Sequence, residues 1–89
     1  MEQYRKLERV VRGFSNHRRI QILALLRQSP GLTVAEVSDR LKLNFKTASE
    51  HLRRLALPGL VQKRSRAASV EHRLTPLGEQ VLRFLQTLG

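Results

Sequence analysis

Two helix-start signals stand close together in the middle of the chain and restrict its fold. Thr33 and Glu36 have the spacing of a capping box, in which each side chain accepts a hydrogen bond from the other residue's backbone N–H. Asn44 is a second N-cap residue, and Leu43 before it can act as a hydrophobic staple. A helix that begins after Thr33 must therefore end before Leu43. The sequence predicts two short helices joined by a tight turn over 38–44.

Apolar residues recur at helical spacing in this pair and on both sides of it. The pattern predicts an amphipathic helix over 2–12 that Gly13 ends, and a central helix from a cap at Ser15 or Asn16 to about Gln28. Buried positions are expected at Val34, Val37 and Leu41 in the third helix, and at Ala48, Leu52 and Leu55 in the fourth.

In the last third of the chain, the spacing of apolar residues changes from that of a helix to the two-residue alternation of a strand. Pro58-Gly59 stops the fourth helix, and the segments Leu60–Ser65 and Val70–Leu74 alternate as short strands around a turn over Arg66–Ser69. Thr75 followed by Pro76 then predicts a capped final helix. Its apolar stripe is Leu77, Val81, Phe84, Leu85 and Leu88.

The predicted fold is mainly α with a small β-hairpin. Its 89 residues suffice for one domain, 1–89. The order helix, helix, short helix, helix, hairpin, helix is that of a winged helix-turn-helix, with five helices and a two-stranded wing. The second helix of the tight pair can then enter a DNA major groove, and the basic hairpin can reach neighbouring phosphates.

The net charge of the chain limits the classes of partner that it can bind. The chain holds 17 Lys and Arg against 7 Asp and Glu, a net charge of +10. A nucleic acid, an anionic membrane surface or an acidic protein would each fit this balance. Most of the cations are arginines, which favours nucleic acid, and an aromatic content of 4% leaves too few anchors for a membrane surface. We expect no membrane partner, no leader segment and a cytoplasmic location, which the absence of Cys also fits.

Candidate DNA contacts follow from the fold, because a helix-turn-helix reads bases from the N-terminal part of its second helix. Phe45 either touches a thymine methyl group or packs on the preceding helix. Glu50 either accepts from a cytosine amino group or pairs with a neighbouring arginine, and we favour the arginine. A solvated polar face is the simpler alternative for the whole set. The expected contacts are Asn44, Phe45, Lys46, Thr47, Ser49, Glu50, Arg53 and Arg54 in the helix, and Lys63, Arg64 and Arg66 in the hairpin.

Four stretches within residues 14–78 carry a family resemblance. They are Phe14–Leu23, Leu43–Leu55, Gly59–Val61 and Arg73–Gly78. Together they resemble the ArsR-like (arsenic-repressor-type) winged-helix transcriptional regulators, and the start of the fourth helix is most similar to archaeal-type members. The last stretch is shared with MarR-like regulators.

The resemblance implies a dimeric, sequence-specific regulator of double-stranded DNA, most simply a repressor that occludes a promoter. The first and last helices expose more apolar surface than so small a core can cover, and in this family they form a homodimer. The expected interface residues are Tyr4, Leu7, Val11, Val81, Phe84, Leu85 and Leu88. The alternative is a winged-helix module that binds proteins, RNA or nucleic acid without sequence preference.

We expect neither a metal, a cofactor nor an enzyme activity. The family's metal sensors use Cys-x-Cys in the third helix or His, Asp and Glu in the last, whereas this chain has no Cys and only Glu79 in residues 76–89. His17, His51 and His72 fall on three separate elements, without the paired spacing of zinc ligands. The 7 acidic residues are scattered, so no active site is indicated.

Overall fold

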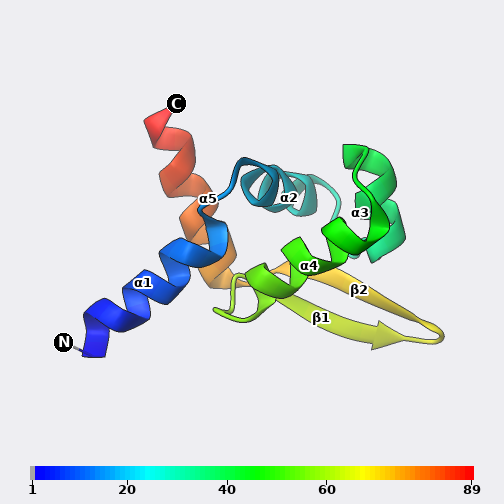
Figure 1. Cartoon of the computed structure of the whole chain (residues 1–89), viewed down its shortest axis with the longest axis horizontal. Helices are drawn as coiled ribbons and strands as arrows, with labels where there is room; N and C mark the ends of the chain where they lie inside the picture. The colour runs from blue at the N-terminus through cyan, green and yellow to red at the C-terminus, as the bar shows by residue number, and fades with distance from the viewer. Residues whose placement is uncertain (1) are drawn as a thin grey trace.

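The computed structural model describes residues 2–89, which form five helices and one hairpin in the predicted order (Figure 1). The mainly α architecture with a two-stranded wing is therefore confirmed. None of the helices within residues 2–89 has the length and apolarity to cross a membrane. The elements are α1 (Glu2–Phe14), α2 (His17–Gln28), α3 (Val34–Leu41), α4 (Phe45–Ala56), β1 (Val61–Arg66), β2 (Ser69–Leu74) and α5 (Pro76–Leu88).

Side-chain caps begin four of the helices, as the sequence predicts. Asn16 accepts from the first turn of α2, and Thr33 and Glu36 form the full capping box of α3. Asn44 accepts from the Thr47 N–H at 3.2 Å, and Thr75 caps α5 ahead of Pro76. These bonds satisfy N–H groups that have no partner inside a helix. The sequence left two candidates for the N-cap of α2, Ser15 and Asn16, and the structure shows that Asn16 is the N-cap.

The turn between α3 and α4 is held by Ser38. Its carbonyl accepts the Leu43 N–H at 2.9 Å, and its hydroxyl donates to the Leu43 carbonyl at 3.0 Å. Lys42 between them adopts the left-handed conformation, with φ of 56°. This conformation ends α3 and reverses the chain, so α4 starts only four residues after Leu41.

Four predicted boundaries are wrong. The first strand of the hairpin starts at Val61, one residue after the predicted Leu60. The first helix continues through Gly13 to Phe14. The hairpin strands also run closer to the tip, because β1 includes Arg66 and β2 starts at Ser69. The turn is thus two residues long rather than four, with Ala67 at a φ of 55° where glycine is usual. Because Ala67 occupies the position where glycine is usual, the sequence does not show the pattern of a two-residue turn.

The core fills the space between α2, α3, α4, the base of the hairpin and α5. Val37 is the buried residue of α3, whereas Val34 and Leu41 are half-buried. In α5 the buried apolar residue is Leu82, which the predicted stripe omitted. The stripe points partly away from the core, so α5 has two apolar faces. The buried apolar residues are Ile22, Leu23, Leu26, Leu32, Val37, Ala48, Leu52, Leu55, Leu60, Val61 and Leu82.

A buried histidine joins the hairpin to the segment before α3. His72 is 1% exposed, and its Nδ1–H donates to the Leu32 carbonyl at 2.9 Å. The same carbonyl accepts the His72 backbone N–H, and the Gly31 N–H donates to the His72 carbonyl at 2.8 Å. These bonds fix the base of the wing against the core.

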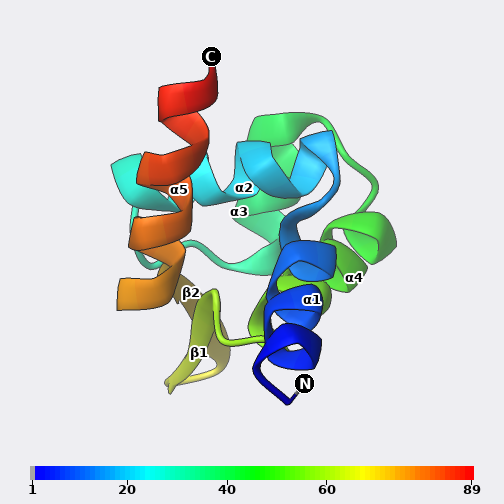
Figure 2. The same ribbon diagram turned by 90° about the vertical axis from the view of Figure 1, so that its left-hand side faces the viewer.

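The first helix is placed by a close approach at Gly13. A Cβ on this glycine would lie 2.6 Å from Cγ of Pro58, which follows α4. The lack of a side chain therefore lets α1 pack directly on the end of α4. Figure 1 shows α1 and α5 at the end of the molecule that holds both termini, and the tip of the hairpin at the opposite end. Figure 2 views the molecule from the α1 and α5 end.

Candidate nucleic-acid interface

The outer surface of α4 carries the predicted helical contacts. Ala48, Leu52 and Leu55 are buried as expected, which orients the rest of the helix outward. Asn44, Phe45, Lys46, Thr47, Ser49, Glu50, Arg53 and Arg54 are all exposed. The structure therefore brings this part of the predicted set together on one surface.

Two residues at the start of α4 have distinct environments. The Asn44 side chain is occupied by its capping bond to Thr47. Phe45 is 58% exposed, so it does not pack away on α3. An exposed aromatic ring beside polar side chains is available to a partner's apolar group, such as a base methyl.

Glu50 pairs with both arginines that follow it. Arg53 Nη2 and Arg54 Nε lie 2.8 Å and 3.0 Å from Glu50 Oε2. Hydrogen bonds from Arg53 and then Arg54 lower the pKa of Glu50 to about 2, and the Glu50 hydrogen bond raises the pKa of Arg53. The pairing with arginine is therefore present, and Glu50 and Arg53 are both charged at neutral pH.

The hairpin divides its cations between two faces. Residues opposite each other in an antiparallel pair share a face. Lys63 lies opposite the buried His72, whereas Arg64 and Arg66 lie opposite Glu71 and Ser69 on the other face. The three predicted wing residues are all exposed, but they do not form a single row.

Sequence analysis missed one cation on the outer face of the hairpin. Arg73 lies opposite Gln62, on the same face as Arg64 and Arg66, and it is exposed. Strict alternation from the buried His72 identifies this position, because neighbours in a strand point to opposite faces.

The predicted dimer residues lie at the opposite end of the molecule from the hairpin tip. Val81 and Leu85 are half-buried. The others are between 50% and 68% exposed: Tyr4, Leu7, Val11, Phe84 and Leu88. Exposed apolar side chains on two helices at one end of a molecule are typical of an interface.

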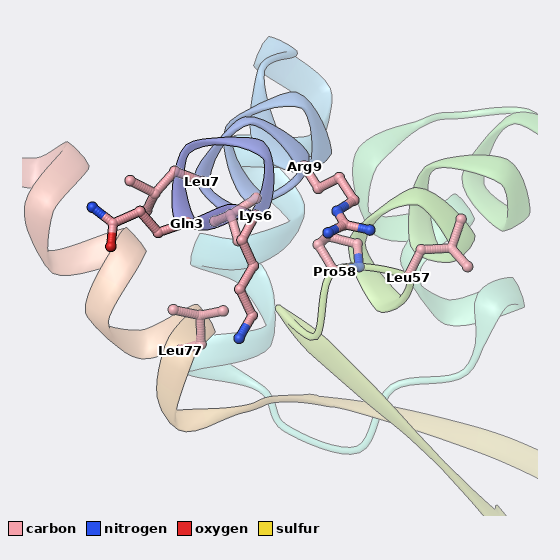
Figure 3. A pocket seen from close by; sticks show the side chains of 8 residues that line it. Gln3, Lys6, Leu7, Arg9, Leu57, Pro58 and Leu77 are labelled. Carbon is pink, nitrogen blue, oxygen red and sulfur yellow. The ribbon is translucent and has the colours of Figure 1, made fainter. Parts of the chain in front are cut away.

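A groove of about 710 Å³ opens between α1, the start of α5 and the end of α4 (Figure 3). Leu7, Pro58 and Leu77 contribute apolar walls. The Lys6 side chain extends from α1 between Leu77 and Pro58, and Arg9 lies beside Pro58. The groove adjoins the exposed apolar residues of α1.

The histidines occupy three unrelated environments. His72 is buried under the hairpin, His51 is half-buried between α4 and α2, and His17 is exposed at the start of α2. Within residues 2–89, His, Cys, Asp and Glu do not gather in any group of three that could hold a metal ion.

Comparisons with known proteins place this arrangement in a family. The model of the bacterial regulatory protein arsR family matches residues 16–63, more than half of the chain. The chain belongs to the ArsR family. The match spans α2, α3, α4 and the start of β1, and therefore includes the complete helix-turn-helix.

Two curated relatives are transcriptional regulators. The transcriptional activator HlyU of Vibrio cholerae is 38% identical over 66 residues, which cover 74% of this chain and 60% of HlyU. An uncharacterised HTH-type transcriptional regulator of Methanocaldococcus jannaschii is 34% identical over 64 residues, 72% of each chain. This ArsR-family chain therefore carries the winged-helix DNA-binding domain of a family of transcriptional regulators, and it spans 60% of the length of HlyU.

Solved structures of similar proteins have the same fold. The homodimeric winged helix-turn-helix DNA-binding domain of a possible ArsR-family regulator from Mycobacterium bovis superposes with a TM-score of 0.89 at 27% identity, over 98% of this chain and 81% of that one. Vibrio cholerae HlyU gives a TM-score of 0.82 at 32% identity, over 98% and 92%. The winged helix-turn-helix predicted from the sequence is thereby confirmed.

Proposed function

We propose that this ArsR-family chain is a homodimeric repressor that binds a specific double-stranded DNA site and occludes a promoter. The observation that carries the proposal is the surface of α4, whose exposed polar side chains lie beside a basic hairpin. Residues 1–89 act as one domain in which α1 and α5 serve dimerisation. The proposed location of the protein is the cytoplasm, where it meets its DNA site.

Base reading is assigned to the start of α4. Lys46, Thr47 and Ser49 are exposed within its first two turns, where a recognition helix meets base edges. Phe45 contacts a thymine methyl group. Arg53 and Arg54 come later in the helix, and their charges suit phosphates, which position a protein without reading sequence.

The hairpin supplies further phosphate contacts. Arg64 and Arg66 share its outer face with Arg73, and Lys63 lies on the inner face. Each phosphate neutralised by Lys or Arg releases condensed counterions, so log K for binding falls by about 0.9 per contact for each log unit of salt. A marked salt dependence is therefore expected.

Dimerisation covers the exposed apolar residues of α1 and α5. Tyr4, Leu7 and Val11 follow one another at helical spacing on α1, and Phe84 and Leu88 do so on α5. A two-fold axis lets the same patch serve both protomers, and it presents two recognition helices to two half-sites about 34 Å apart. The homodimeric state of the Mycobacterium bovis domain supports this arrangement.

Selection of DNA from a random duplex pool by the full chain tests the proposal. We expect enrichment of an inverted repeat whose halves are about one helical turn apart. Repression is then tested by transcription in vitro from a promoter that overlaps the selected site, where added protein should reduce the transcript. No enrichment would favour the protein-binding or non-specific module, and an increase in transcript would favour an activator, as HlyU is named.

A further inference from the structure

The N-terminus of α2 and one flank of α4 bring together basic side chains that have no assigned role. Arg19 Nη1 lies 3.5 Å from Nδ1 of His51, and Arg18 Nη1 reaches the Leu41 carbonyl at the end of α3 at 3.4 Å. We call Arg18, Arg19 and His51 the α2–α4 basic cluster. Its members come from two helices, and it adjoins the exposed surface of α4.

Arg19 is incompletely satisfied in this cluster. Its Nε is buried and has no hydrogen-bond partner among the described residues. Burial and then the charge of Arg54 lower the pKa of Arg19. A guanidinium that is partly desolvated and faces another cation is stabilised when an anion approaches its free N–H groups.

The cluster lacks its own counter-charge. The carboxylate that acts on Arg19 and His51 is Glu50, and it already accepts hydrogen bonds from Arg53 and Arg54. Burial and then the charge of Arg19 lower the pKa of His51, which leaves its Nδ1 as an acceptor that orients Arg19.

The position of the cluster relative to the wing suggests which anion it meets. In Figures 1 and 2, α2 lies on one side of α4 and the hairpin lies on the other. A recognition helix in a major groove about 12 Å wide has a phosphate strand along each side. The hairpin faces one of the two DNA strands. The phosphates of the other DNA strand then lie on the side of α4 where α2 is.

We infer that the α2–α4 basic cluster binds a DNA phosphate on the side of α4 opposite the wing, with Arg19 as its main contact and His51 as a positioning residue. This inference rests on the proposed DNA binding. It extends the interface beyond α4 and the hairpin to the first turn of α2. Since a phosphate is present at every nucleotide, the contact adds affinity without adding sequence preference.

Binding of a selected duplex and a scrambled duplex over a salt series tests this inference. Arg19→Gln is expected to weaken both duplexes by the same factor, at least about tenfold at low salt. It should also lower the salt slope by about 0.9 for each protomer. Arg83→Gln is the matched control, because it removes the same charge from an exposed position on α5 that belongs to no proposed contact.

A second variant keeps the test decisive if Arg19→Gln folds poorly. Arg19→Lys retains the charge but loses the planar fork, so it should keep the salt slope and lose affinity. Thermal unfolding verifies that each variant is folded. In the wild type, binding of the selected duplex should shift the NMR signals of the Arg19 Nε–H and the His51 ring.

The outcomes separate this inference from the proposed function. If the wild type binds the selected duplex but Arg19→Gln keeps the wild-type slope and affinity, the cluster does not contact DNA. If inorganic phosphate alone shifts the Arg19 and His51 signals while both duplexes leave them unchanged, the site serves a small phosphorylated ligand and the inference is wrong. If the wild type binds neither duplex, the proposed function itself fails.

Discussion

The carboxylate of Glu50 bridges the guanidinium of Arg53, with 3.0 Å between Nε and Oε1 and 2.8 Å between Nη2 and Oε2. Arg54 adds a third hydrogen bond at 3.0 Å. In the free protein, one acid thus holds two of the cations assigned to DNA phosphates. The strength of DNA binding therefore depends on how readily Arg53 and Arg54 exchange Glu50 for phosphate.

Replacing Glu50 with Gln is expected to tighten DNA binding. The substitution removes a negative charge from the interface and releases both arginines, so affinity should rise roughly threefold to tenfold at low salt. The rise should be equal for selected and scrambled duplexes. Fluorescence anisotropy with both duplexes measures it. A loss confined to the selected duplex would mean that Glu50 reads a base.

Gly13→Ala is expected to destabilise the fold although alanine favours helix. The new Cβ would meet Pro58, at a cost of about 1–3 kcal/mol for overpacking against a gain of about 1 kcal/mol in helix propensity. Urea unfolding should thus show a net loss of up to about 2 kcal/mol instead of the gain that helix propensity alone would give. The double variant with Pro58→Ala should recover part of it. A stabilisation of about 1 kcal/mol by Gly13→Ala, the full gain in helix propensity, would show that α1 does not pack on the end of α4.

Stability is expected to fall as the pH drops from 7 to 5. Burial is the main cause that lowers the pKa of His72, and burial also lowers that of His51, so both pKa values lie below the unfolded value of about 6.5. Below pH 6.5 the unfolded chain binds more protons than the folded one, so protonation favours unfolding. The stability contributed by neutral His72 is thus complete above this pH and is lost as the pH falls toward its folded pKa.

Urea unfolding at pH 7.5 and pH 5 measures this effect. His72→Gln removes the titrating group and keeps an amide donor for the Leu32 carbonyl, so it should be less stable at pH 7.5 and lose less on acidification. An equal loss in the wild type and in His72→Gln would assign the pH dependence to other groups.

Charge placed on the exposed apolar face of α5 is expected to dissociate the dimer. Phe84 is a better position for this test than Leu85, because Leu85 is half-buried and its replacement would also disturb the monomer. Phe84→Glu should give a monomer by light scattering and lose operator affinity, since a buried unpaired charge costs several kcal/mol. Gln86→Glu adds the same charge but keeps an acceptor for Arg27, so it should remain dimeric. A wild type that is monomeric at tens of micromolar would contradict the two-fold arrangement.

Local signals predict most of the fold. The caps at Asn16, Thr33, Asn44 and Thr75 are visible in the sequence because each bond joins residues two or three positions apart. The exposed surface of α4 is equally predictable, because three apolar positions at helical spacing orient the helix.

Contacts between distant segments were not predictable in the same way. Gly13 has the pattern of a helix end, and only the proximity of Pro58 explains it as a packing position. His72 is buried because Leu32, far away in the sequence, supplies its partner. Arg19 likewise acquires its environment from His51 and Arg54 in another helix. Such roles depend on tertiary packing, which no local period encodes.

The ratio of affinities for a selected operator and a scrambled duplex tests the central claim most directly. At physiological salt the wild type should prefer the operator by about 10³-fold or more. Ser49→Ala should reduce this ratio while binding of the scrambled duplex stays the same, whereas Arg66→Ala should weaken both duplexes alike and leave the ratio unchanged. A wild-type ratio near one, or equal effects of Ser49→Ala on both duplexes, would show that α4 does not read bases.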